Sequence, residues 1–283
     1  MKILVTGAGG MLGRDFVEAA EAASHDVVAL GHAELDITDA KQTTEEIGSA
    51  APDVVVNCAA WTDVDGAEAA EAEATELNGA GAGNVAAAAA EAGAVVVYPS
   101  TDYVFDGRRG EPYAEGDKTR PLSAYGRSKL AGEQATAEAN PRNFVVRTSW
   151  VFGPYGKNFV ETMLRLGEER DEILVVSDQV GCPTYTAHLS EGLLELIEEE
   201  EYGIHHLAGA GHCSWSDFAR EIFTQAGVDC EVKPATSAQV PRPAPRPSYG
   251  VLTSEREDAI PLPPWRQGIG EYLKRRVALG SRR

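Results

Sequence analysis

A glycine-rich loop directly after the first strand constrains the fold of this chain more than any other feature. Lys2–Thr6 is a short apolar run, and Gly7, Gly10 and Gly13 follow it at the start of a helical stretch. Such glycines allow a tight turn and let the backbone approach a pyrophosphate at a helix N-terminus. The spacing is G-x-x-G-x-x-G instead of the more familiar G-x-G-x-x-G, but its place after strand one predicts a dinucleotide site.

The rest of the first half alternates Val/Ile-rich runs with Ala/Glu-rich helical segments. This pattern predicts an α/β fold, a Rossmann-type doubly wound parallel sheet with helices on both faces. Further strands are expected at Asp26–Leu30, Asp53–Asn57, Ala94–Pro99 and Phe144–Arg147, with a sixth candidate at Ile173–Ser177.

Beyond residue 150 the pattern becomes less regular. We expect 1–150 to form the dinucleotide-binding domain and 151–283 a smaller, mainly substrate-binding region, from which the strand near 173–177 returns to the main sheet. Helices are expected at Asn158–Arg170, His188–Glu200 and Ser216–Gln225. The Pro-rich segment Pro234–Pro247 is either a linker or a fixed loop that crosses the substrate.

The choice between NADPH and NADH depends on the end of the second strand. An acidic residue there favours NAD, whereas this strand ends in Gly31-His32, and His32 tolerates a 2′-phosphate. We therefore favour NADPH slightly over NADH and keep dual use open. The predicted cofactor-binding residues are Gly7, Gly10, Met11, Leu12, Gly13, His32, Asp36, Ile37, Ala59 and Ala60, together with Tyr125 and Lys129.

Three residues form a candidate catalytic constellation. Thr101 follows the fourth strand, at the carboxyl edge where ligands of such sheets bind. Tyr125 and Lys129 are four residues apart, so they share one helix face. A nearby ammonium and an oxidised nicotinamide favour the phenolate, so we expect a lowered pKa for Tyr125 and a role in proton transfer. Alone, a Tyr and a Lys at this spacing are common on surface helices.

Charge and cysteine content narrow the class of partner. The net charge is -19, which disfavours nucleic acid and anionic membranes as partners. It favours adaptation to a salty cytoplasm, with plain solubility as the alternative. The four cysteines are far apart and lack metal-ligand spacing, so we predict no metal site. No apolar run is long enough to span a bilayer and the start has no signal-peptide layout, so we expect a cytoplasmic protein with reduced thiols.

Several strings resemble the dTDP-4-dehydrorhamnose reductase family of extended short-chain dehydrogenases/reductases. The resemblance spans nearly the whole chain. Its narrowest strings are S-T-D-Y-V-F and D-Q-x-G-x-P-T, which are more specific than the general motifs of that superfamily. All the resembling stretches together are Lys2–Gly7, Ser100–Gly107, Tyr125–Glu133, Arg147–Phe152, Asn158–Val160 and Asp178–Thr184.

The resemblance implies that Thr101, Tyr125 and Lys129 are catalytic, with Tyr125 protonating the oxygen formed at C4 of a dTDP-linked keto sugar. Lys129 also holds the nicotinamide ribose. Asp102, Tyr103 and Trp150 are implied near the sugar, and Asn158 and Arg246 near the phosphates. Trp61 replaces the tyrosine usual in the family and keeps an aromatic group there.

Other functions on the same scaffold stay open at this point. They are a sugar-nucleotide epimerase or dehydratase and a non-catalytic dinucleotide-binding regulatory subunit. A dehydratase commonly carries Asp-Glu after the threonine, whereas Tyr103 follows Asp102 here. A homodimer is also left open.

Overall fold

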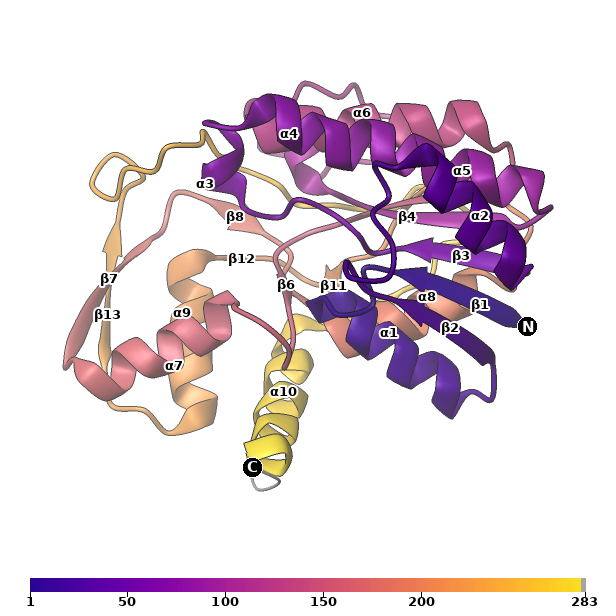
Figure 1. Cartoon of the computed structure of the whole chain (residues 1–283). Coiled ribbons are helices and arrows are strands. Elements are labelled where there is room, and N and C mark those ends of the chain that lie inside the picture. Colours follow the sequence, from indigo (N-terminus) through magenta and orange to yellow (C-terminus); the bar gives the residue numbers. More distant parts are fainter. Residues whose placement is uncertain (281–283) are drawn as a thin grey trace.

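A six-stranded parallel sheet organises the computed structural model, which describes residues 1–280. Its strand order is β10-β5-β4-β3-β1-β2, and every neighbouring pair is parallel (Figure 1). This confirms the predicted α/β class. The strands are β1 (Lys2–Thr6), β2 (Asp26–Leu30), β3 (Val54–Asn57), β4 (Val95–Thr101), β5 (Asn143–Thr148) and β10 (Gly203–His206).

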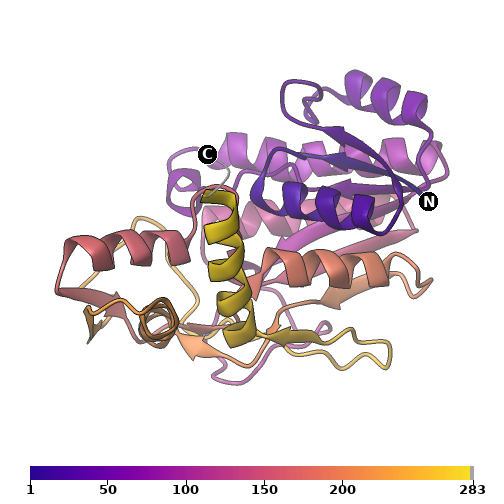
Figure 2. The same cartoon turned by 90° about the horizontal axis from the view of Figure 1, so that it is seen from below.

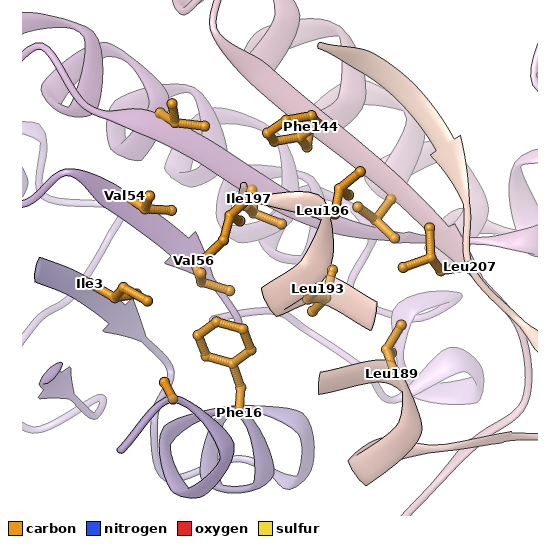
Figure 3. Packing of buried hydrophobic residues seen from close by; sticks show 14 of the residues in the cluster. Ile3, Phe16, Val54, Val56, Phe144, Leu189, Leu193, Leu196, Ile197 and Leu207 are labelled. Atoms are coloured by element: carbon orange, nitrogen blue, oxygen red, sulfur yellow. The ribbon is translucent and has the colours of Figure 1, made fainter. Parts of the chain in front are cut away.

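Helices cover both faces of this sheet because successive strand residues point to opposite sides. Ile3 and Val5 face a core that contains Phe16 and Leu189, whereas Leu4 faces a second core on the other side (Figure 3). The first core is covered by α1 (Met11–Ala22) and α8 (Thr186–Leu196), which lie side by side in Figure 2. The other face is covered by α2 (Ala40–Ala50), α5 (Ala82–Glu91) and α6 (Ala124–Ala139).

The first half also contains short helical elements above the sheet. These are α3 (Val64–Ala67), α4 (Glu71–Thr75), a π-helical segment η1 (Glu76–Gly81) and a 3₁₀ turn η2 (Asp102–Val104). Among residues 1–280, no helix has both the length and the apolar character that are needed to cross a membrane.

The second half builds a separate lobe with its own apolar core. Phe152, Phe218, Trp265 and Tyr272 are almost fully buried there. The helices are α7 (Phe159–Glu169), α9 (Trp215–Ala226) and α10 (Trp265–Gly280). The strands are β6 (Val151–Phe152), β7 (Glu172–Val176), β8 (Val180–Gly181), β9 (Thr184–Tyr185), β11 (Gly209–Ala210), β12 (Cys213–Ser214), β13 (Glu231–Ala235) and β14 (Leu262–Pro264).

The strand predicted near 173–177 exists, but its expected return to the main sheet is wrong. This strand is β7, and it pairs with β13 in a two-stranded sheet of the lobe. Buried and exposed residues alternate along β7, whereas every residue of β5 is buried. Only a strand covered on both faces is buried throughout. The second half instead supplies β10, so the main sheet draws on both sides of residue 150.

Candidate active site

Thr101, Tyr125 and Lys129 come together at the carboxyl edge of the main sheet. Thr101 ends β4, and its side chain caps η2 by accepting a hydrogen bond from the Tyr103 amide at 3.2 Å. Ser123 caps α6 in the same way, which places Tyr125 in the first helical turn and Lys129 one turn later. The spacing predicted from the sequence therefore forms one helix face.

Burial dominates the proton affinity of the Tyr125 phenol. It raises the pKa of Tyr125 to about 12, the Asp102 carboxylate adds to the rise, and a hydrogen bond with Thr101 opposes it. The lowered pKa expected from the sequence is therefore wrong for the protein by itself, because desolvation of the phenolate outweighs the hydrogen bond that would stabilise it. A protonated phenol at neutral pH suits a proton donor.

Lys129, one helical turn after Tyr125, is held by contacts of its ammonium group. Its Nζ donates to the Pro99 carbonyl at 2.8 Å and lies 3.9 Å from the centre of the Tyr98 ring. Burial lowers the pKa of Lys129 to about 7, and the carboxylate of Glu133 opposes that effect. Glu133 in turn forms a buried ion pair with Arg147, 2.7 Å between Oε2 and Nη2. The ammonium is thus fixed in position by groups below the site.

Two of the three residues implied near the sugar, Asp102 and Tyr103, differ in how they contact the catalytic residues. Asp102 is buried, and burial raises the pKa of its carboxyl to about 7 while hydrogen bonds with Thr101 and Ser149 lower it. The Tyr103 ring meets the Tyr125 ring edge-on, with centroids 5.7 Å apart. Asp102 therefore contacts the site through the Thr101 hydroxyl, which donates to it at 3.2 Å, whereas the Tyr103 ring lies beside the Tyr125 ring.

Trp150 links the site to the second lobe. Its φ of +47° is in the left-handed region, which is uncommon for a residue with a side chain. The indole stacks on Trp215 with ring centroids 3.5 Å apart. Gly181 leaves room for it, since a Cβ there would lie 2.5 Å from the indole Cε2. The strained backbone and the stack hold the Trp150 ring in one orientation.

The glycine loop has the geometry that a dinucleotide requires. Gly7 has a φ of +61°, and a Cβ on it would lie 2.5 Å from the Ala59 amide nitrogen. A Cβ on Gly13 would lie 2.5 Å from the Gly7 carbonyl oxygen. Gly10 caps α1 without any side-chain acceptor, which leaves the first amides of α1 for a ligand such as pyrophosphate. The loop residues and Ala59 therefore fit the predicted cofactor.

The residues predicted near the adenosine ribose are arranged less simply. His32 is exposed after β2, whereas Ile37 is almost fully buried and packs against Gly81, so its side chain belongs to the core. Asp36 accepts hydrogen bonds from the amide and hydroxyl of Thr38.

A residue that sequence reasoning missed lies at the same place. The Glu34 carboxylate accepts a hydrogen bond from the Gly31 amide at 2.9 Å, so it stands at the end of β2. Its sequence position, four residues past the strand, gave no signal of this. The chain folds back at Glu34 toward the end of β2. Its carboxylate therefore stands where the dinucleotide-binding motif usually carries an acidic residue.

The two residues expected near the phosphates are both engaged within the protein. Asn158 caps α7, accepting from the Glu161 amide at 2.9 Å and donating to the Gly153 carbonyl at 2.8 Å. Arg246 forms a two-pronged ion pair with Asp65, with both nitrogen–oxygen distances 3.0 Å. A phosphate role for either side chain remains a prediction and requires these contacts to change.

Comparison with known proteins gives a consistent family. Residues 1–277 match the model described as RmlD substrate binding domain. The chain is similar to a dTDP-4-dehydrorhamnose reductase of Mycolicibacterium smegmatis, 46% identical over 279 residues that cover 96% of this chain and 85% of the relative. It is also similar to the spore coat polysaccharide biosynthesis protein SpsK of Bacillus subtilis, 40% identical over 277 residues, 97% and 98% of the two chains.

Solved structures extend the similarity to three dimensions. A dTDP-4-dehydrorhamnose reductase from Clostridium acetobutylicum has a TM-score of 0.94 and 43% identity, covering 97% of this chain and 99% of that one. The Bacillus anthracis enzyme of the same name, in complex with NADP, has a TM-score of 0.94 and 39% identity at the same coverage. This chain therefore belongs to the RmlD substrate binding domain family of dTDP-4-dehydrorhamnose reductases and their relatives, which confirms the resemblance seen in its sequence.

Proposed function

We propose that this protein uses NADPH or NADH to reduce the C4 ketone of dTDP-4-dehydro-L-rhamnose, which yields dTDP-L-rhamnose. The observation that carries the proposal is the Tyr125 phenol, beside Thr101 and one helical turn from the buried Lys129, at the sheet edge that also holds the glycine loop. The names of the full-length relatives support the choice of substrate.

The geometry supports the following roles for the side chains. The bound dinucleotide supplies the hydride. Thr101 donates a hydrogen bond toward the C4 oxygen and holds the carbonyl beside Tyr125. The Tyr125 phenol is protonated at neutral pH and delivers its proton to that oxygen as negative charge develops there. Lys129, held by the Pro99 carbonyl, binds the nicotinamide ribose and stabilises the phenolate that remains.

We also propose that Tyr103 and Trp150 lie on the sugar side of the site. The Tyr103 ring lies beside Tyr125 and the Trp150 indole stacks on Trp215, and sugar rings pack well on aromatic side chains. We also place the protein in the cytoplasm, which is supported by the absence of disulfides among its four cysteines.

Turnover with purified substrate tests the proposal. The protein, NADPH or NADH and dTDP-4-dehydro-L-rhamnose are mixed at low and at multimolar salt. Cofactor oxidation is followed by absorbance and the product by mass. We expect one cofactor oxidised per sugar and a product heavier by two hydrogens. Absence of turnover with either cofactor at either salt concentration would contradict the proposal. Dehydration of dTDP-glucose without net cofactor consumption would contradict it as well.

A further inference from the structure

A buried polar cluster joins α6 to the ends of two central strands. Glu133 of α6 lies at its centre, and its partners are Ser100 of β4 and Arg147 of β5. No more than 5% of each residue is exposed. Ser100 and Arg147 lie opposite each other in the register of β4 and β5. The cluster therefore ties three neighbouring elements together at one level of the sheet.

The hydrogen bonds of the cluster fix the Glu133 carboxylate at both oxygens. Oε1 accepts from the Ser100 hydroxyl at 2.5 Å and from Arg147 Nε at 2.9 Å. Oε2 accepts from Arg147 Nη2 at 2.7 Å, and Arg147 Nη1 donates to the Glu115 carbonyl at 3.2 Å. A two-pronged contact between guanidinium and carboxylate defines geometry as well as energy. Because both charges are buried, neither side chain can move away without a large loss of stability.

Lys129 makes the neighbouring contact between the same helix and the same strand. It lies one helical turn before Glu133, so both side chains are on the helix face that also carries Tyr125. Lys129 Nζ donates to the Pro99 carbonyl at 2.8 Å, and Pro99 directly precedes Ser100 in β4. Consecutive residues of the strand thus hold successive turns of the helix. A shift of α6 that breaks the contact of Glu133 with Ser100 also displaces the Lys129 ammonium.

Gly132 brings α6 close to β4 between these two contacts. A Cβ at Gly132 would lie 2.1 Å from both the Tyr98 hydroxyl oxygen and the Asn78 carbonyl oxygen. The Tyr98 ring is the one whose centre lies 3.9 Å from Lys129 Nζ. An interface packed this closely has no spare volume, so a small displacement of the helix reaches the site instead of being absorbed.

We propose that Glu133 is a positioning residue, which anchors α6 on the ends of β4 and β5 and thereby holds the Lys129 ammonium where the reduction requires it. The inference rests on the function proposed above. Glu133 acts through Lys129, not through contact with the substrate or the cofactor. Its carboxylate also opposes the effect of burial, which lowers the pKa of Lys129 to about 7. Loss of the carboxylate would therefore disturb both the place and the charge of the ammonium.

Ser100→Ala is the primary variant, because it removes the hydroxyl that holds Glu133 and leaves the ion pair with Arg147. With saturating NADPH we expect kcat to fall roughly tenfold, since a small misplacement of a catalytic group slows the chemical step. KM for the sugar nucleotide stays within about twofold of the wild-type value. The matched control is Ser190→Ala in α8, a buried serine whose hydroxyl donates to the Thr186 carbonyl at 2.8 Å. It loses a comparable hydrogen bond and should keep the wild-type kcat.

The pH profile of kcat supplies a measurement that a mere loss of folded protein would not change. Glu133→Gln removes the negative charge one helical turn from Lys129. The other charged or titratable groups around this part of the site are Tyr98 on β4, Tyr125 on α6, Arg147 on β5 and Cys58 directly after β3. Reduction requires the protonated lysine, so activity falls as the pH rises through the pKa of Lys129. Without the carboxylate that pKa is lower, and we expect the fall to begin about one pH unit lower.

Two variants keep the carboxylate and separate its place from its charge. Ser100→Ala and Glu133→Asp should both lose rate while their activity falls at the wild-type pH. The shorter side chain of Glu133→Asp still pairs with Arg147 but cannot reach Ser100 as well. If Glu133→Gln does not fold because a buried guanidinium loses its partner, these two variants decide the question.

The outcomes distinguish the proposed function from the positioning role. If the wild-type protein does not turn over the substrate, the proposed function fails, whatever the variants do. If it does, equal kcat values for Ser100→Ala and Ser190→Ala overturn the positioning role, whether both are unchanged or both fall. A wild-type kcat in Glu133→Asp overturns it as well. So does a profile of Glu133→Gln that falls at the wild-type pH, because the Lys129 ammonium would then be independent of Glu133.

Discussion

The sheet half and the second lobe reach the site by different physical means. In the sheet half, main-chain geometry places the groups, since Gly7 and Gly13 lie where any Cβ would strike backbone atoms. In the lobe, side chains fix the groups, as in the Trp150–Trp215 stack and the Asp65–Arg246 ion pair. The difference teaches that the backbone specifies the glycine loop proposed for the cofactor, whereas replaceable side chains hold the residues proposed for the sugar side.

The largest expected effect tests whether Tyr125, a residue of the sheet half, is the proton donor. Tyr125→Phe removes the phenol hydroxyl and leaves the aromatic ring that contacts Tyr103. We expect kcat to fall by roughly a thousandfold, as for the loss of a general acid. Cofactor affinity should stay near the wild-type value. Rates are followed by cofactor oxidation.

The control for this change is Tyr202→Phe. The Tyr202 ring packs on Phe144, and neither residue belongs to the candidate site. Activity of Tyr125→Phe close to that of the control would move the proton donor elsewhere, and Tyr103 of η2 would be the next group to vary.

The second effect sharpens the contrast in backbone specification. Gly7→Ala places a side chain at a left-handed φ and against the Ala59 amide, so we expect the free energy of unfolding to drop by about 2 to 3 kcal/mol. Gly9→Ala is the matched control, because a Cβ there meets no atom within 4 Å. Unfolding in denaturant without cofactor measures both. Equal stability of the two variants would contradict the idea that the main chain specifies this loop.

The smallest effect concerns the charged side chain of Glu34, at the cofactor end of the sheet half. Glu34→Gln removes the carboxylate that accepts from the Gly31 amide. The Glu34 carboxylate and the 2′-phosphate of NADPH are both negative. Two like charges about 4 Å apart repel by about 1 to 4 kcal/mol near a protein surface. We expect the ratio of NADPH to NADH affinity to rise roughly tenfold, as measured by fluorescence titration.

Glu45→Gln, on the exposed face of α2, is the control for this charge change and should leave the ratio unchanged. A ratio that does not move in Glu34→Gln either would assign cofactor choice to His32 or Asp36 instead.

The sequence predicted the parts of the fold that depend on local pattern. β1 and β2 match their predicted bounds at both ends, because apolar runs between a helix and a glycine have few alternatives. β7 was predicted as a strand but assigned to the wrong sheet, since pairing partners depend on contacts between distant segments. The sequence did not predict β10, which completes the main sheet beside β5.

The candidate site was predictable where a motif names residues and unpredictable where burial decides the chemistry. The 125/129 spacing placed Tyr125 and Lys129 on one face, as observed. The direction of the Tyr125 pKa shift depends on how deeply the phenol is buried, which no spacing reveals. The partnership of Asp65 with Arg246 spans 181 positions and has no local signature.

The place of β10 in the main sheet has a consequence for how the protein is made. A nascent chain that has emerged only as far as residue 150 has β5 as an open edge, with unpaired backbone groups along one side. It also lacks α8, so Phe144 and Val146 have no cover from Leu193 and Leu196 (Figure 3). The sheet is complete only after His206 has left the ribosome. The dinucleotide-binding half therefore matures late in synthesis, together with the lobe that holds the sugar.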